Sequence, residues 1–163
     1  MRMMLTGAGA VGECILKMLE KRDPKGEWLS YVLLADFDLK RADEVKSHLE
    51  QERKFREGTQ YETAQVDARD REALTALMRE HRIDFVMDAA SPFVSNFIFD
   101  AAFEAEADYA SMGTWSVPKD HPEFGKGFEG AYLEPMTKYN FDRHEAWKEK
   151  GQMACICLGI DPG

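Results

Sequence analysis

A glycine-rich hexapeptide close to the amino terminus constrains the fold of this chain more than any other feature. Gly7-Ala8-Gly9-Ala10-Val11-Gly12 follows a short apolar segment at residues 2–6 and precedes a helical pattern that stops at Asp23. Glycines at this spacing often arise by chance. A strand before them and an amphipathic helix after them, however, are typical of a dinucleotide-binding turn. The predicted apolar stripe of the helix comprises Val11, Cys14, Ile15, Met18 and Leu19.

The glycines of this turn have separate predicted roles. Gly7 permits the tight turn, Gly9 lets a diphosphate approach the backbone, and Gly12 lets the helix pack closely on the strand. The first amides of a helix have no partner inside the helix, so they can bind an anion. We therefore predict that the pyrophosphate of a dinucleotide is bound by Gly7, Gly9, Ala10, Val11 and Gly12. The alternative is an ordinary strand-to-helix turn without a ligand.

Apolar segments of strand length alternate with amphipathic helical segments along the chain. The predicted strands are residues 2–6, 29–35, 61–66, 83–90, 108–112 and 153–160. This alternation predicts an α/β fold with a parallel sheet covered on both faces. We expect a Rossmann fold, a doubly wound sheet of about six strands in the order 3-2-1-4-5-6. The chain has 163 residues, 44% of them hydrophobic, which suffices for one core, so residues 1–163 are predicted to form one domain.

The residue after the second predicted strand bears on the choice of cofactor. Asp36 lies about two dozen residues beyond Gly12, where a carboxylate accepts hydrogen bonds from the hydroxyls of the adenosine ribose. A 2'-phosphate would be repelled there, so we predict NAD as the cofactor. Lys40 and Arg41 are close enough in sequence to weaken that repulsion, which keeps NADP as the alternative.

Two further strand ends contribute predicted cofactor contacts. Asp67 and Ala68 follow the third strand, and Asp67 is expected either to reach the adenine edge or to cap the next helix. The segment after the fourth strand lies at the switch point of the sheet, where the ribose and nicotinamide would bind. Its predicted contacts are Ala89, Ala90, Ser91 and Pro92. Ser91 is a candidate helix cap, and Pro92 suits the first helical position.

Composition excludes several other classes of protein. A net charge of -9 and the lack of a basic face argue against a nucleic-acid partner. Three cysteines and four histidines show no metal-ligand spacing, so no metal site is predicted. Cys155 and Cys157 alternate on the predicted last strand and are expected to be buried and inert. Without a signal peptide or a long apolar run, the chain is expected to be cytoplasmic, with no membrane partner.

Residues 113–138 interrupt the regular alternation. Prolines and glycines there predict a long loop that serves as a lid or an interface or is disordered. Asn140 is expected to cap a short helix before the last strand. Tyr109 and His121 are possible general acids or bases. We interpret Tyr109 as a core residue and His121 as a surface residue of the loop. Catalytic residues are therefore left unknown.

Several short segments carry a resemblance to a known family. Besides the glycine turn, they are residues 35–42, 66–70, 88–93 and 159–163. With these segments the whole chain resembles the nicotinamide-cofactor domain of the saccharopine dehydrogenase family. That family includes lysine 6-dehydrogenase-like and carboxynorspermidine dehydrogenase-like enzymes. The segment Gly159-Ile160-Asp161-Pro162-Gly163 is the most specific, since a similar turn in the family follows the sixth strand and leads into the catalytic domain.

The resemblance implies an NAD(P)-dependent oxidoreductase. Its members act on carbon-nitrogen (CH-NH) bonds of amino-acid or polyamine-like small molecules, and hydride would move near Met112, Gly113 and Asp161. The chain stops at Gly163, so the catalytic domain is expected to be missing and the chain alone to be inactive. An apolar rim left by that domain would favour a homo-oligomer. The alternatives are a non-catalytic NAD(P)-sensing module and a domain that binds S-adenosylmethionine, against which Gly12 argues.

Overall fold

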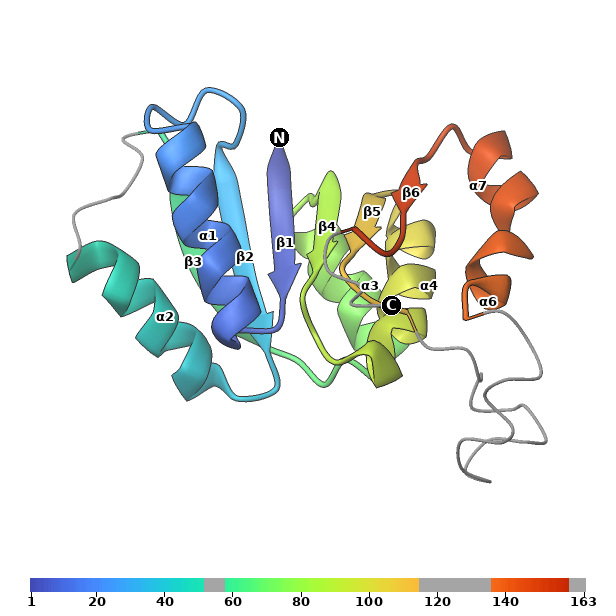
Figure 1. Cartoon of the computed structure of the whole chain (residues 1–163), viewed down its shortest axis with the longest axis horizontal. Helices are drawn as coiled ribbons and strands as arrows, with labels where there is room; N and C mark the ends of the chain where they lie inside the picture. Colours follow the sequence, from blue (N-terminus) through green and yellow to red (C-terminus); the bar gives the residue numbers. More distant parts are fainter. Residues whose placement is uncertain (52–57, 115–135, 159–163) are drawn as a thin grey trace.

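The computed structural model describes residues 1–51, 58–114 and 136–158, which form a six-stranded sheet with helices on both faces (Figure 1). Every recorded strand pair is parallel, and the strand order is β3-β2-β1-β4-β5-β6. The strands are β1 (Arg2–Thr6), β2 (Tyr31–Asp36), β3 (Gln60–Gln65), β4 (Phe85–Asp88), β5 (Asp108–Ser111) and β6 (Ala154–Cys155). This confirms the predicted doubly wound topology, which the alternating segments had indicated.

Helices lie between the strands in sequence and divide between the two faces of the sheet (Figure 1). They are α1 (Ala10–Arg22), α2 (Leu39–Gln51), α3 (Arg71–Glu80), the short 3-10 helix η1 (Pro92–Val94), α4 (Ser95–Ala105), α6 (Lys138–Phe141) and α7 (His144–Glu149). Neighbouring residues of β1 face opposite cores. Met3 and Leu5 pack with α1 and α2, whereas Met4 packs in the core that includes α3 and α4.

The strands in both halves of the sheet have their carboxyl ends at one common edge. At the carboxyl end of β1, Thr6 pairs with Ala35 of β2 on one side and with Asp88 of β4 on the other. The ladder continues one residue further, because the amide of Gly7 donates to the carbonyl of Ala35 at 2.9 Å. The strand order reverses between β1 and β4. In such sheets ligands bind at that switch point.

The buried face of α1 differs from the predicted stripe. Gly12, Leu16 and Glu20 are buried, with Ile15 and Leu19 partly buried. The other three predicted members, Val11, Cys14 and Met18, are exposed. The physical reason is the packing of Gly12 against the turn, which fixes the rotation of the helix about its axis and directs Val11 outward.

The carboxyl-terminal part also departs from the prediction. The strand expected at 153–160 is recorded as pairing only over Ala154–Cys155, and Cys157 adopts a left-handed φ of 59° that takes it out of strand geometry. Cys155 is half-buried and Cys157 is exposed, so the expectation that both are buried is wrong. Asn140 lies within α6 and caps no helix. Of the predicted loop, residues 115–135 lie outside the described residues, as do His121 and residues 159–163.

None of the helices in the described part of the chain has the length and apolar character that a membrane span requires.

Candidate functional site

The first turn packs directly against the end of β4. Gly7 has a φ of 92°, a left-handed conformation that side chains rarely adopt. A β-carbon at Gly7 would lie 2.7 Å from the carbonyl oxygen of Ala89 and 2.8 Å from the nitrogen of Ala90. Only glycine therefore lets the turn after β1 touch the segment after β4. The contact brings two of the predicted cofactor-binding segments together.

The start of α1 offers unoccupied amides. Gly9 precedes the helix and has no side chain to cap it, and within the described residues no acceptor is recorded for the amides of Ala10, Val11 and Gly12. Among the residues that the structure describes, no heavy atom apart from the chain neighbours lies within 4 Å of a β-carbon placed at Gly9, so these residues leave the space beside this backbone open. Free amides and the positive end of a helix dipole next to open space suit an anion such as a diphosphate.

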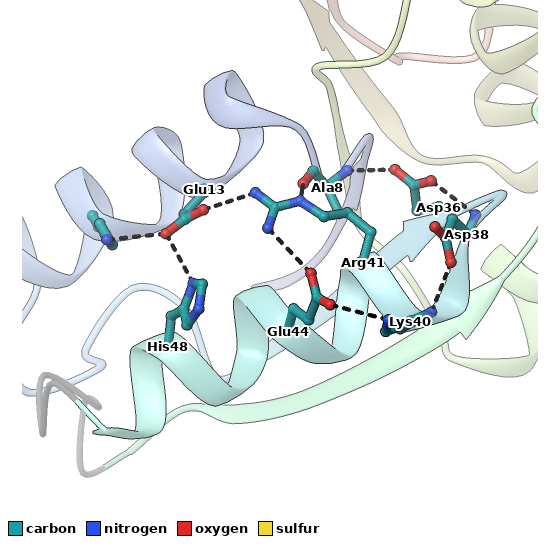
Figure 2. A network of polar contacts seen from close by, with 9 residues as sticks. Ala8, Glu13, Asp36, Asp38, Lys40, Arg41, Glu44 and His48 are labelled. Atoms are coloured by element: carbon teal, nitrogen blue, oxygen red, sulfur yellow. Dashed lines mark hydrogen bonds and ion pairs between the residues drawn. The ribbon is translucent and has the colours of Figure 1, made fainter.

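The carboxylate of Asp36 is held in place by the glycine turn. Its Oδ2 accepts a hydrogen bond from the amide of Ala8 at 2.7 Å, and its Oδ1 accepts one from the amide of Asp38 at 2.9 Å (Figure 2). The carbonyl of the same Ala8 accepts a hydrogen bond from Nε of Arg41 at 2.9 Å. The amide and the carbonyl of Ala8 are therefore both hydrogen-bonded within the protein, and the amide is not free for a ligand.

A cleft of about 570 Å³ runs along the carboxyl ends of the strands. This volume is within the range of sites for small molecules and cofactors. Its lining residues come from the ends of β1 to β4 and from the start of the helices that follow. They are Thr6, Gly7, Gly9, Ala35, Asp36, Phe37, Val66, Asp67, Ala68, Arg69, Leu74, Ala89, Ala90, Ser91 and Val94.

Eight of the twelve predicted cofactor-binding residues line this cleft, and they come from all four predicted segments. Ala10, Val11, Gly12 and Pro92 are not among the lining residues, although Ala10 and Val11 are exposed at the helix start. Gly12 is buried beneath the turn, so it acts through packing. Ser91 precedes η1 without a side-chain cap, and Pro92 occupies the first turn as expected.

Asp67 forms a paired arrangement with Arg69 at the rim of the cleft. Its oxygens accept hydrogen bonds from the Arg69 side chain at 2.6 to 3.2 Å and from the Arg69 amide at 2.9 Å. These hydrogen bonds lower the pKa of Asp67 to about 2. The cap of α3 is Asp70, which accepts from the amide of Ala73 at 2.9 Å. Of the two roles predicted for Asp67, helix capping is therefore wrong.

A buried carboxylate lies beneath the cleft at the end of β4. Asp88 is 2% exposed and accepts hydrogen bonds from the hydroxyl of Thr6, the amide of Ala90 and the hydroxyl of Tyr109, at 3.0, 3.0 and 2.8 Å. Burial raises the pKa of Asp88, which the hydrogen bonds oppose. Tyr109 is itself buried, as predicted, with its hydroxyl committed to Asp88. Asp88 therefore ties β1 and β5 to the segment that carries Ala89 and Ala90.

Sequence reasoning missed two side chains of the cleft that a ligand would meet. Phe37 is 74% exposed beside Asp36, and Arg69 lines the cleft after the end of the neighbouring strand β3. Their position immediately after predicted strands was the available signal, because residues at the carboxyl ends of parallel strands share one edge. A second cavity, of about 460 Å³, lies among α4, α6, α7 and β6 and shares no lining residue with the cleft.

No group of three or more metal-ligating side chains gathers within the ranges that the structure describes. The cleft instead combines the backbone of Gly9, a fixed carboxylate and an exposed aromatic ring, and the free amides of α1 begin directly after Gly9. This set of groups fits the parts of a dinucleotide, namely its diphosphate, ribose and base.

Comparison with protein families gives a match over almost the whole chain. Residues 3–155 match the family described as the saccharopine dehydrogenase NADP binding domain. Among curated relatives, a carboxyaminopropylagmatine dehydrogenase of Synechocystis sp. is 24% identical over 99% of this chain and 35% of its own length. A carboxynorspermidine synthase of Vibrio alginolyticus is 25% identical over 100% of this chain and 37% of its own length. The chain thus spans just over a third of these relatives.

Solved structures share the fold at low sequence identity. Saccharopine dehydrogenase from Saccharomyces cerevisiae superimposes with a TM-score of 0.65 and 15% identity, over 99% of this chain and 28% of that one. An NAD binding oxidoreductase from Klebsiella pneumoniae gives a TM-score of 0.60 and 14% identity, over 96% of this chain and 34% of that one. These likenesses confirm the architecture.

Proposed function

Because the chain belongs to the saccharopine dehydrogenase family through its NADP-binding domain, we propose that it binds NAD as part of an oxidoreductase acting on carbon-nitrogen bonds. Members of the family are oxidoreductases. The substrates that we propose are small amino-acid or polyamine-like molecules. Two relatives support this class by name, one a carboxyaminopropylagmatine dehydrogenase and the other a carboxynorspermidine synthase. Both names denote enzymes, which favours an enzymatic role over a non-catalytic sensor.

The proposal rests on the free amides at the start of α1, which directly follow Gly9, and Gly9 lines the same cleft as the fixed carboxylate of Asp36. In the proposed complex, the amides near Gly9 to Gly12 hold the pyrophosphate, and the turn at Gly7 keeps them at the switch point. Gly12 contributes by letting α1 lie close to β1. Ala10 and Val11 contribute exposed backbone.

The adenosine half is proposed to occupy the β2 and β3 side of the cleft. Asp36 would accept hydrogen bonds from the ribose hydroxyls, and Phe37 with Ala68 would pack against the adenine ring. Asp67, held by Arg69, would lie at the edge of the base. The carboxylate of Asp36 would repel a 2'-phosphate, which is the reason for proposing NAD over NADP.

The nicotinamide half is proposed to occupy the β4 side. Ala89, Ala90 and Ser91 line the cleft with small side chains, which leave room for a ribose and a flat ring. Pro92 begins η1 and fixes the direction in which the chain leaves this site. A bound nicotinamide supplies the hydride chemistry, and the residues of this chain bind and orient it. We assign no general acid or base.

Titration of the purified chain with NADH and with NADPH, followed by nicotinamide fluorescence, tests this function. We expect saturable binding of NADH and at least roughly tenfold weaker binding of NADPH, the size expected for one unfavourable charge contact. Preference for NADPH would refute the cofactor assignment alone. A lack of binding for both nucleotides, with the chain shown to be folded by circular dichroism, would refute the binding function.

A further inference from the structure

Glu13 contacts two cationic side chains and a histidine, which come from two helices beside the glycine turn. Its carboxylate contacts Nη2 of Arg41 at 2.9 Å, Nζ of Lys17 at 3.0 Å and Nδ1 of His48 at 3.4 Å (Figure 2). The Glu13 side chain is only 17% exposed. Hydrogen bonds, the one from Lys17 first, hold the pKa of Glu13 below its ordinary value despite partial burial. Glu13 is therefore an anion at neutral pH.

Arg41 is the cation of this group that lies nearest to the proposed ribose position. It sits in the first turn of α2, where its Nε donates to the carbonyl of Ala8 and its Nη2 to Glu13. The amide of Ala8 donates to Asp36. The guanidinium of Arg41 is thus linked to the carboxylate of Asp36 through the backbone of one residue, Ala8, although it faces α1.

An arginine beside the adenosine ribose is a good ligand for a 2'-phosphate, because guanidinium and phosphate form strong charge-assisted hydrogen bonds. In this chain the guanidinium already has an anionic partner in Glu13 at 2.9 Å and a second in Glu44 at 3.6 Å. A 2'-phosphate would have to displace Glu13 or share the arginine with it. Either event weakens the phosphate contact.

We infer that Glu13 is a specificity-determining residue that withholds Arg41 from the 2'-position of the cofactor and so strengthens the preference for NAD. This inference rests on the proposed function, in which Asp36 marks the ribose. Glu13 acts as a positioning residue, since it reaches the ligand only through Arg41. Asp36 repels the 2'-phosphate directly, whereas Glu13 occupies the guanidinium of Arg41 that would otherwise bind this phosphate.

Glu13→Gln tests the inference, because it removes the charge with little change of shape. Suitable probes are adenosine 2',5'-bisphosphate and adenosine 5'-monophosphate, which differ only in the 2'-phosphate. We expect the variant to bind the bisphosphate about fivefold to tenfold more tightly, roughly the effect of freeing one charge-assisted contact. Binding of the monophosphate should stay within about twofold, since the 2'-phosphate contact is the only one changed.

Glu44→Gln is the matched control. It removes another carboxylate that contacts Arg41. Because Glu44 is 46% exposed and its Oε2 lies 3.6 Å from Nη1 of Arg41, the ratio of bisphosphate to monophosphate affinity should change less than about twofold. In the double variant E13Q/R41M the gain should disappear, because no guanidinium remains to meet the phosphate. Glu13→Asp, which keeps the charge but shortens the reach to Arg41, is a second variant in case E13Q does not fold. It should shift the ratio in the same direction by a smaller factor.

Two results would overturn the inference while the proposed function stands. The first is an unchanged affinity ratio in folded E13Q and E13D that still bind the monophosphate. The second is tighter binding of the bisphosphate that persists in E13Q/R41M, because net charge and not Arg41 would then be its cause. If the wild-type chain binds neither these probes nor NADH and NADPH, the proposed function fails and the inference with it.

Discussion

Gly12 lies so close to Gly7 that a β-carbon on Gly12 would overlap the carbonyl oxygen of Gly7. At Gly9, three residues earlier, a β-carbon would meet no heavy atom within 4 Å beyond its chain neighbours. Two glycines of one motif therefore differ in purpose. Gly12 is required by the packing of α1 on the turn, whereas no contact within the described residues requires a glycine at position 9.

Alanine substitutions should separate these purposes. Gly12→Ala is expected to destabilise the fold by at least about 1–3 kcal/mol, because the overlapped atom belongs to the backbone and has little freedom to move. Gly9→Ala should keep the free energy of unfolding within about 0.5 kcal/mol and lower NADH affinity by about tenfold through the methyl group in the diphosphate space. Urea unfolding and NADH titration measure the two effects. A Gly9→Ala variant with unchanged affinity would remove the pyrophosphate from this turn.

Asp36→Asn should shift the cofactor preference. The amide oxygen of asparagine can still accept the hydrogen bond from Ala8, whereas its amide nitrogen cannot accept the one from Asp38, and the negative charge is lost. We expect the ratio of NADPH to NADH affinity to rise by about tenfold, as for one charge contact removed. Parallel titrations at low ionic strength measure this ratio. An unchanged ratio would mean that no 2'-phosphate comes near Asp36.

Phe37→Ala should weaken NADH binding without loss of stability. The ring of Phe37 is 74% exposed, so the protein alone gains little from it. Loss of a packing partner for adenine is expected to lower affinity by roughly fivefold, in line with aromatic pair energies. Phe141→Ala is the matched control, because Phe141 is 65% exposed but lines the separate cavity at α6 and α7. Equal effects of both substitutions would place the adenine elsewhere.

Asp88→Asn should change how stability depends on pH. Burial raises the pKa of Asp88 in the folded state. The folded state binds this proton more tightly than the unfolded state does. The resulting stabilisation is fully present below the unfolded pKa of about 3.9 and is lost as the pH rises through the folded pKa. The free energy of unfolding of the wild type, minus that of the asparagine variant, should fall over that interval. Urea titrations at several pH values measure it, and a difference that rises with pH would contradict the assignment.

Local patterns were sufficient to predict the strand order and eight of the residues that line the cleft. The glycine turn and the residues that follow each strand identify the common edge of the sheet, because parallel strands all end there. Eight predicted residues line the cleft accordingly. Their contact with a cofactor remains a prediction.

Tertiary contacts account for what the patterns did not predict. The rotation of α1 follows from the contact between Gly12 and Gly7, which lies in the turn before the helix. The helical periodicity does not include this contact and therefore predicted, incorrectly, that Val11 is buried. The pair Glu13 and Arg41 joins residues 28 positions apart, and no local signal links them. The short β6 follows from the left-handed backbone of Cys157. The residues around Cys157 in the sequence do not predict this conformation.

If backbone amides at the start of α1 bind a dinucleotide diphosphate, their chemical shifts change when the cofactor binds. In a nitrogen-15 NMR titration of the chain with NADH, we predict the largest shifts at the amides of Ala10, Val11 and Gly12, with further shifts at residues after β2 and β4. Shifts confined to the cavity among α4, α6 and α7, with the glycine turn unchanged, would contradict the claim.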